Sequence, residues 1–359
     1  MTNRVYVIAE IGVNHNGSLE LAKQLIERAV EAGADAVKFQ TFKADKLVTP
    51  EASKAQYQRE TTDREQSQLD MLKKLELSEA DHHVLMAQCA ELGIDFLSTP
   101  FDEDSLHFLA QRCKLSRLKL PSGEITNGPL LLAAAKSGLP IFLSTGMSTI
   151  SEVEQALQVL AFGYLNSNLA PGKAHFESAY ASPEGRRLLQ EKVVLLHCTT
   201  EYPCPFEEVN LRSMDTLRDA FQLSVGYSDH TEGIAVSVAA AARGASVIEK
   251  HFTLDRNMEG PDHRSSIEPQ QFREMVQSIR QIEIAMGSPY KGPTTSELKN
   301  KPIVRKSLVA SAPIAEGERF TERNITMKRP GLGISPMEYW DLLNRIASRN
   351  YHVNEQISR

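Results

Sequence analysis

The chain has 359 residues, of which 41% are hydrophobic and 24% are charged, as expected for a globular protein with a sizeable core. Its formal net charge is −6, and its lysines and arginines are scattered, so nucleic acids and anionic membranes are poor candidate partners. No apolar run approaches the roughly 20 residues that span a bilayer, and the first strand follows the start without a signal-peptide pattern. We therefore expect a cytoplasmic protein.

The four cysteines lack the spacing of zinc or redox motifs; they are Cys89, Cys113, Cys198 and Cys204. Because cytosolic chains seldom carry disulfides, we expect buried, reduced thiols. Cys198 follows a histidine at the end of a predicted strand, so a role as a nucleophile stays open. Packing is the commoner role of a strand-borne cysteine.

Short apolar runs alternate with helical patterns over the first 286 residues. Strands are predicted over 5–12, 35–42, 95–101, 115–124, 140–147 and 193–203, and in two later runs that end at His230 and His251. Helical spacing predicts helices over 19–32, 79–92, 103–112, 128–137, 151–163, 212–221, 233–243 and 268–286. Eight strands, each followed by a helix, favour a (β/α)8 TIM barrel, whose typical size is ~250 residues. A doubly wound open sheet competes, but no Gly-rich phosphate fingerprint follows the first strand.

Two connections are longer than a compact barrel needs. The polar stretch 43–74 indicates a loop with a function, since long connections are uncommon without one. The stretch 163–187 fits a surface hairpin, a dimer contact or a substrate-selecting lid, and a tolerated surface insertion is the favoured interpretation.

Polar residues stand at the carboxyl end of every predicted strand, where barrel enzymes place their active sites. The histidines at the ends of the last two strands, His230 and His251, indicate a metal site because two imidazoles would meet at one mouth. Lys38 and Lys119, among several hydroxyl side chains, indicate a site for a doubly charged anion. The histidines at 82, 83, 107, 175 and 352 show no partner pattern and are expected at the surface.

After Met286 the sequence becomes rich in Pro and Gly, which is typical of a linker, here predicted over 287–303. Residues 304–359 then form short β-like runs and are expected to be a small second domain beside the catalytic domain, 1–286. Arg329 lies in a Gly/Pro-rich loop of this domain, suited either to reach into a partner's site or to form an ordinary solvated turn.

Ten motifs in chain order resemble the sialic acid synthase family, which includes N-acetylneuraminate synthase and the legionaminate and pseudaminate synthases. They are AEIGVNHNG (9–17), VKFQTF (37–42), FLSTPFD (96–102), KLPSGE (119–124), LSTGM (143–147), LLHCTTEYP (195–203), YSDH (227–230), EKHFTLD (249–255), GPDH (260–263) and KRPGLGISP (328–336). The resemblance implies a TIM barrel followed by a β-rich antifreeze-like (SAF) domain. It also implies a homodimer in which each small domain caps the partner's active site.

The activity implied by the resemblance is that of a phosphoenolpyruvate-dependent transferase of carbohydrate biosynthesis that forms a carbon–carbon bond. It condenses phosphoenolpyruvate with an N-acylated amino sugar, in the first instance N-acetylmannosamine, to give N-acetylneuraminate and phosphate. The alternative product is N,N'-diacetyllegionaminate, made from a 2,4-diacetamido-2,4,6-trideoxymannose acceptor, and the stretches YSDHTEGI and SGEITN lean toward it. A remoter alternative is another metal-dependent barrel aldolase or 3-deoxy-ulosonate phosphate synthase, and a decayed barrel without catalysis is the non-enzymatic one.

The resemblance also assigns roles to the strand-end residues. His230 and His251 would bind a divalent metal, Mn²⁺ first, with Mg²⁺ or Co²⁺ as alternatives. Phosphoenolpyruvate would contact Lys38, Thr99, Lys119, Ser122, Ser144 and Ser228. The amino sugar would contact Gln40, Glu124, Tyr202 and Arg329. Glu10 is the first candidate for the general base, supported by Glu249 and Asp262.

Overall fold

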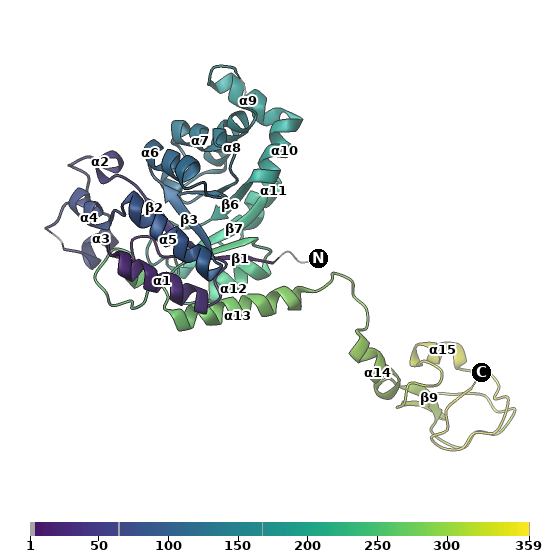
Figure 1. Cartoon of the computed structure of the whole chain (residues 1–359). Coiled ribbons are helices and arrows are strands. Elements are labelled where there is room, and N and C mark those ends of the chain that lie inside the picture. The colour runs from purple at the N-terminus through teal and green to yellow at the C-terminus, as the bar shows by residue number, and fades with distance from the viewer. Residues whose placement is uncertain (1–3, 64, 167, 359) are drawn as a thin grey trace. The chain divides into compact units, whose positions relative to one another are not determined.

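The computed structural model describes residues 4–63, 65–166 and 168–358. The chain separates into two compact units, residues 1–287 and residues 288–359. In the first unit, strands lie at the centre and helices surround them (Figure 1). No helix within the described ranges is both long enough and apolar enough to cross a membrane.

The first unit is built on an eight-stranded sheet in the order β3-β2-β1-β8-β7-β6-β5-β4, and the strands that pair in it run parallel. The two ends of this order, β3 and β4, are consecutive in the chain and lie beside each other, so the sheet is a nearly closed barrel. The predicted TIM barrel is therefore confirmed. The strands are β1 (Tyr6–Glu10), β2 (Ala36–Thr41), β3 (Asp95–Pro100), β4 (Leu118–Leu120), β5 (Ile141–Ser144), β6 (Val193–His197), β7 (Ser224–Asp229) and β8 (Val247–His251).

One layer of helices covers the outside of the barrel. These helices are α1 (Leu19–Glu31), α5 (Glu79–Leu92), α6 (Glu103–His107), α7 (Gly128–Lys136), α8 (Ile150–Tyr164), α11 (Ser213–Phe221), α12 (Ala235–Ala242) and α13 (Pro269–Met286). In α1, the Ser18 side chain caps the amino end by accepting from the Leu21 N–H, and Leu25 and Ile26 on one face are fully buried.

The barrel interior has an apolar floor and a polar mouth. Ile8, Leu97, Phe142 and Leu196 belong to one buried cluster inside the barrel. Residues nearer the carboxyl ends of the same strands are polar, as the sequence indicated. The polar residues therefore gather at the end of the barrel where the strands end.

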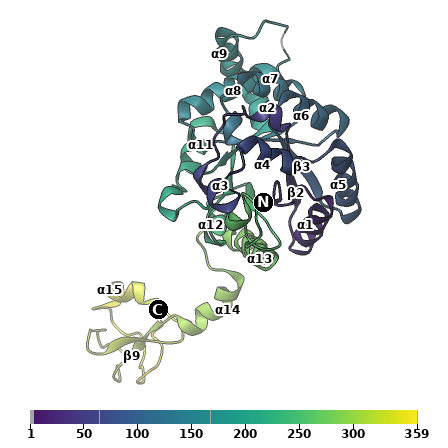
Figure 2. The same ribbon diagram turned by 90° about the vertical axis from the view of Figure 1, so that its left-hand side faces the viewer.

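The two long connections contain helices. The first contains α2 (Ala44–Leu47), α3 (Gln56–Thr61) and α4 (Gln68–Leu75), which lie across one end of the barrel (Figure 2). The second contains α9 (Lys173–Ala181) and α10 (Pro183–Lys192), so this stretch is helical. The sequence of α10 begins with Ser182 as its cap and Pro183 at the first position, which are signals for a helix start.

The second unit has its own apolar core around a two-stranded antiparallel sheet of β9 (Ser307–Ala310) and β10 (Ile325–Lys328). Its core includes Phe320 and Tyr351, and a short helix, α15, spans Tyr339–Leu342. A further helix, α14 (Thr295–Val304), occupies the second half of the stretch predicted as a linker. Thr294 and Glu297 form a capping box at its start, a signal that the Pro- and Gly-rich composition masked.

Candidate active site

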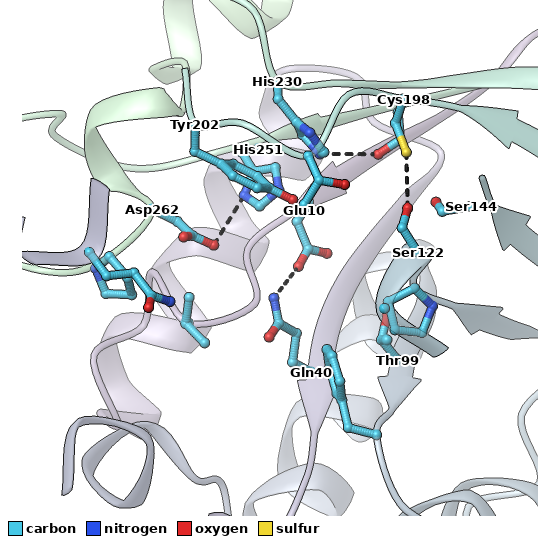
Figure 3. Close-up of a pocket in the computed structure, with 18 of the residues that line it drawn as sticks. Glu10, Gln40, Thr99, Ser122, Ser144, Cys198, Tyr202, His230, His251 and Asp262 are labelled. Atoms are coloured by element: carbon cyan, nitrogen blue, oxygen red, sulfur yellow. Dashed lines mark hydrogen bonds and ion pairs between the residues drawn. The ribbon is translucent and has the colours of Figure 1, made fainter. Parts of the chain in front are cut away.

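A cavity of about 330 Å³ opens at the carboxyl ends of the barrel strands. Thirteen of the fifteen predicted site residues line it, and Figure 3 shows several of their side chains converging. They are Glu10, Lys38, Gln40, Thr99, Lys119, Ser122, Ser144, Tyr202, Ser228, His230, Glu249, His251 and Asp262. The structure therefore brings residues from seven strands and from the connections after β4, β6, β7 and β8 into one space.

Two predicted residues do not line this cavity. Glu124 ends the 3-10 turn after β4, and its carboxylate accepts a hydrogen bond of 2.6 Å from the Asn127 amide at the start of α7. The sugar contact predicted for Glu124 stays a prediction. Arg329 belongs to the second unit, and its role stays a prediction.

Two lysines and two glutamates form a buried charge cluster at the mouth. Lys38 pairs with Glu10 and lies 3.8 Å from Glu249, while Lys119 lies 3.4 Å from Glu249. All four side chains are almost fully buried, so each charge depends on its partners for compensation. The Lys38 ammonium also donates to the Thr99 hydroxyl at 3.1 Å, which adds a donor group next to the cations.

The two glutamates differ in proton affinity. Burial raises the pKa of Glu10 to about 7, and Lys38 offsets only part of this effect. Burial also opposes ionisation of Glu249, but Lys119 and Lys38 together lower its pKa to about 2. Burial raises the pKa of Asp262 to about 7 as well. Carboxyls whose pKa values are pushed apart in one cavity are typical of acid–base sites.

The two strand-end histidines face each other with ring centroids 5.3 Å apart. The Nδ1 of His230 contacts the Thr199 carbonyl at 2.6 Å, which makes this nitrogen the donor and Nε2 the acceptor. Nε2 has only a long contact of 3.4 Å with the Ser228 hydroxyl, which donates to Glu249 at 2.7 Å. The Nδ1 of His251 is buried without a hydrogen-bond partner among the described residues, and Asp262 lies 3.5 Å from it. Burial lowers the pKa of His230 to about 4 and that of His251 well below its ordinary value.

These imidazoles fit part of a metal site. Neutral imidazole is the form that binds divalent cations, and a second hydrogen bond that fixes the ring is typical of metal-ligating histidines. Within the described ranges, no group of three or more His, Cys, Asp or Glu is arranged to hold an ion. The protein would therefore supply two imidazoles and leave the remaining coordination positions to water or substrate.

Comparisons with known proteins assign the family. The NeuB family pattern matches residues 25–291, and the SAF domain pattern matches residues 305–358. The chain belongs to the NeuB family. It is 50% identical to the N,N'-diacetyllegionaminic acid synthase of Campylobacter jejuni, over 99% of both chains. It is 45% identical to the enzyme of the same name from Legionella pneumophila, over 96% of this chain and 91% of that one.

A solved structure agrees with this family. The N-acetylneuraminic acid synthetase of Leptospira borgpetersenii shares 31% identity, with a TM-score of 0.66, over 83% of this chain and 90% of that one. The predicted resemblance, the barrel with a SAF domain and the prediction of a synthase enzyme are thereby confirmed.

One wall of the cavity in this NeuB-family enzyme comes from the first long connection and is mainly apolar. We call it the apolar wall; it consists of Leu47, Val48, Met71, Leu72 and Leu75. Tyr57 of α3 lies beside it and packs on Tyr202, with ring centroids 5.1 Å apart. The sequence indicated that this connection has a function, but it singled out none of these residues. The apolar spacing of Met71 and Leu75 was a signal that α4 packs on the mouth.

Cys198 also lines the cavity, but its partner is a hydroxyl. Its sulfur lies 3.2 Å from the Ser122 oxygen, which in turn accepts from the Gly146 N–H at 2.9 Å. A hydroxyl cannot activate a thiol as a base would, so the packing role is favoured. All four cysteines are free and buried, as predicted. The Ser144 hydroxyl is buried without a hydrogen-bond partner among the described residues, which leaves it available to a ligand.

The NHN motif of the β1 loop ties down the loop that carries Asp262. Asn14 donates to the Phe252 carbonyl at 2.9 Å and to the Ser266 hydroxyl at 2.8 Å. Ser266 donates to the backbone carbonyl of Asp262 at 2.7 Å.

The prediction that His82 is at the surface is wrong, because it is buried and contacts the Thr41 hydroxyl at 2.8 Å.

Proposed function

We propose that this enzyme condenses phosphoenolpyruvate with 2,4-diacetamido-2,4,6-trideoxymannose to give N,N'-diacetyllegionaminate and phosphate. In the balanced reaction, C3 of the donor attacks the open-chain aldehyde of the sugar, water adds at C2, and phosphate leaves. The observation that carries the choice of acceptor is the identity of 50% and 45%, over nearly full length, to two enzymes named for this product.

The apolar wall supports the same acceptor. With the aldehyde end of the sugar at the two histidines, we infer that its far end extends toward the apolar wall, which lines the same cavity. The proposed acceptor carries a methyl group at C6 and a second acetamido group at C4, both with apolar surface. N-acetylmannosamine has hydroxyls at these positions, and a hydroxyl placed against Val48 or Leu72, away from the lining amides of Gln58 and Gln68, would lack a hydrogen-bond partner.

N-acetylneuraminate synthesis is the second candidate. Relatives named for N-acetylneuraminate products are similar at lower identity, such as the human N-acetylneuraminate-9-phosphate synthase, which is 34% identical over 90% of this chain and 82% of that one. Both reactions would use the same donor and the same charge cluster. The acceptor alone distinguishes them.

The donor would bind at the charge cluster. Phosphoenolpyruvate carries a phosphate and a carboxylate, and Lys38 and Lys119 offer two buried ammonium groups. Ser144, Thr99 and Ser122 add hydroxyl donors nearby. In the absence of this ligand the glutamates neutralise the lysines, so donor binding would exchange carboxylate partners for ligand oxygens.

A divalent cation, Mn²⁺ first, would bind to His230 and His251. Its chemistry would be that of a Lewis acid that polarises the sugar aldehyde, worth several kcal/mol in the transition state. The Nε2 of His230, whose only contact is the Ser228 hydroxyl at 3.4 Å, and the Nδ1 of His251, which has no hydrogen-bond partner among the described residues, support this assignment. Imidazole ligands do not select Mn²⁺ over Mg²⁺ or Co²⁺, so the identity of the ion rests on the family resemblance.

Glu10 would move the proton of the attacking water. Its pKa of about 7 lets it accept and return a proton near neutral pH. Glu249 stays ionised beside the lysines, and its Oε1 also accepts a hydrogen bond of 2.7 Å from Ser228. Glu249 would therefore act as a fixed charge that orients the cluster.

We further infer a cytoplasmic homodimer, with the SAF domain of one chain capping the other's site.

The test measures phosphate release from phosphoenolpyruvate with each acceptor in turn, with Mn²⁺ and with a chelator. We expect kcat/KM for the diacetamido acceptor to exceed that for N-acetylmannosamine by at least tenfold, and chelation to abolish both. A preference for N-acetylmannosamine would favour the second candidate. Full activity in excess chelator would remove the metal from the proposal.

A further inference from the structure

A buried ion pair joins the ends of β7 and β8 behind the wall of the cavity. The Lys250 ammonium lies 3.1 Å from the Asp229 carboxylate, and both side chains are fully buried. These two residues directly precede His230 and His251. Because successive strand residues point to opposite faces, Lys250 is directed away from the barrel interior into which His251 projects. Neither charged residue lines the cavity.

The pair fixes the backbone on both sides of His230. The Asp229 carboxylate accepts from the Thr231 N–H at 2.8 Å and from the Thr231 hydroxyl at 2.7 Å. It also accepts from the Ser237 hydroxyl of α12 at 2.6 Å. Lys250 donates to the Thr231 carbonyl at 2.5 Å. The residue after one histidine is thus bonded to the residue before the other.

Stability alone is a weak reason for such a pair. Taking two charges out of water costs several kcal/mol per ion, and well-packed apolar residues of similar volume are often as stabilising or more so. The pair does, however, supply a fixed separation between the backbones that carry His230 and His251, which a two-imidazole site needs. The ordinary β7–β8 ladder ends at Asp229 and Lys250, and beyond it the Lys250–Thr231 bond connects the two chains.

We propose that the Asp229–Lys250 pair is a positioning device that sets the separation of His230 and His251 so that both imidazoles bind one divalent cation. This inference rests on the proposed metal site. Lys250 acts through Asp229 and Thr231 and touches neither metal nor substrate. Partners that orient the ligands of a metal typically contribute 10- to 100-fold to its affinity.

The experiment titrates the full chain with Mn²⁺ and follows free Mn²⁺ by electron paramagnetic resonance, beside a thermal unfolding curve without metal. Lys250→Met removes the bond to Thr231 but leaves a buried carboxylate without its cation. The double variant Asp229→Asn/Lys250→Met is free of that charge and close in volume, so it remains a valid test if the single variant does not fold. His251→Ala identifies the titration step that belongs to the two-imidazole site.

Arg280→Met is the matched control. It breaks the 2.7 Å ion pair between Arg280 and Asp35, which ties α13 to the loop before β2 at the opposite end of the barrel. We expect Lys250→Met and the double variant to bind Mn²⁺ at least tenfold more weakly than the parent chain. The control should lose stability while its Mn²⁺ affinity stays unchanged.

Three results would overturn the inference. Affinity within twofold of the parent in the double variant would show that the pair has only a structural role. An equal loss of affinity in Arg280→Met would show that any destabilisation of the barrel weakens the site. If the parent chain and His251→Ala bind Mn²⁺ equally, the metal site itself fails and this inference falls with it.

Discussion

Glu10 and Glu249 are two carboxylates in one cavity whose neighbours give them different proton affinities. Lys119 and Lys38 keep Glu249 ionised, and burial leaves Glu10 with a pKa of about 7. Only a group that changes protonation near neutral pH can serve as the proton carrier. The sequence named Glu10 as the first candidate for the base, but it could not rank the protonation states of the two residues.

Replacing Glu10 by glutamine tests its role. The amide cannot accept a proton, so we expect kcat to fall by about 10²- to 10⁴-fold. Donor affinity should hold or rise, because Lys38 loses the carboxylate that competes with the ligand. Steady-state kinetics and calorimetric titration with phosphoenolpyruvate measure both quantities. Glu232→Gln, at an exposed carboxylate paired with Arg256, is the control, and a near-normal kcat in Glu10→Gln would exclude the base.

His15 predicts a pH dependence of stability. Burial lowers its pKa to about 4, and its Nδ1 accepts from the Gly17 N–H at 3.0 Å, a bond that protonation of this nitrogen would break. Between pH 6.5 and pH 4 the unfolded chain binds a proton that the folded chain does not. Stability is therefore full above pH 6.5 and falls by up to about 3 kcal/mol as the pH drops to 4.

Urea unfolding from pH 7 to pH 4.5 measures this effect. His15→Gln removes the titrating group, so its free energy of unfolding should fall less steeply with acid than that of the parent chain. His83→Gln, at an exposed histidine, should leave the slope unchanged. Equal slopes in the parent and His15→Gln would contradict the assignment.

At the scale of elements, the strands were predictable because each is an apolar run that ends in polar residues. In every strand–helix unit these polar residues stand at the carboxyl end of the strand. From the sequence alone, that pattern predicts that Lys38, His230 and His251 lie at one mouth of the barrel. Glu124 lies beyond this pattern: the 3-10 turn after β4 brings its side chain to the Asn127 amide at 2.6 Å, a local contact that the strand pattern does not predict. The sequence did not predict the apolar wall, because polar residues dominate the stretch that contains α4.

The apolar wall predicts acceptor specificity at the level of α4. Leu72 is half-buried in the wall, and Leu72→Asn would give a sugar hydroxyl a partner while removing apolar contact from a deoxy carbon. We expect the ratio of kcat/KM between the diacetamido acceptor and N-acetylmannosamine to fall at least tenfold, within the 1–3 kcal/mol typical of one apolar group. Lys74→Asn, exposed on the same helix, is the control. An unchanged ratio with normal activity would show that Leu72 of the apolar wall does not determine acceptor specificity, and it would leave the proposed reaction intact.

At the scale of the whole molecule, the chain consists of a catalytic barrel and a SAF domain with separate cores. The composition change after Met286 located this division in the sequence. Dimerisation and capping by the SAF domain remain predictions from the family resemblance, because contacts between chains leave no periodic pattern in one sequence.

Arg329→Ala tests the capping role. If this guanidinium reaches the acceptor in the partner's site, its loss should raise the KM for the sugar about tenfold or more, while the KM for phosphoenolpyruvate changes little. Sedimentation equilibrium should show a dimer for both the parent and the variant. Arg323→Ala, exposed in the same domain, should leave both KM values unchanged. An unchanged sugar KM in Arg329→Ala would count against capping.

A competition assay tests the central claim most directly. The enzyme is given phosphoenolpyruvate, Mn²⁺ and equal concentrations of 2,4-diacetamido-2,4,6-trideoxymannose and N-acetylmannosamine. The amount of each product is then quantified by mass spectrometry at low conversion. The account predicts that N,N'-diacetyllegionaminate exceeds N-acetylneuraminate by at least tenfold. Dominant N-acetylneuraminate, or donor consumption without either nine-carbon acid, would contradict it.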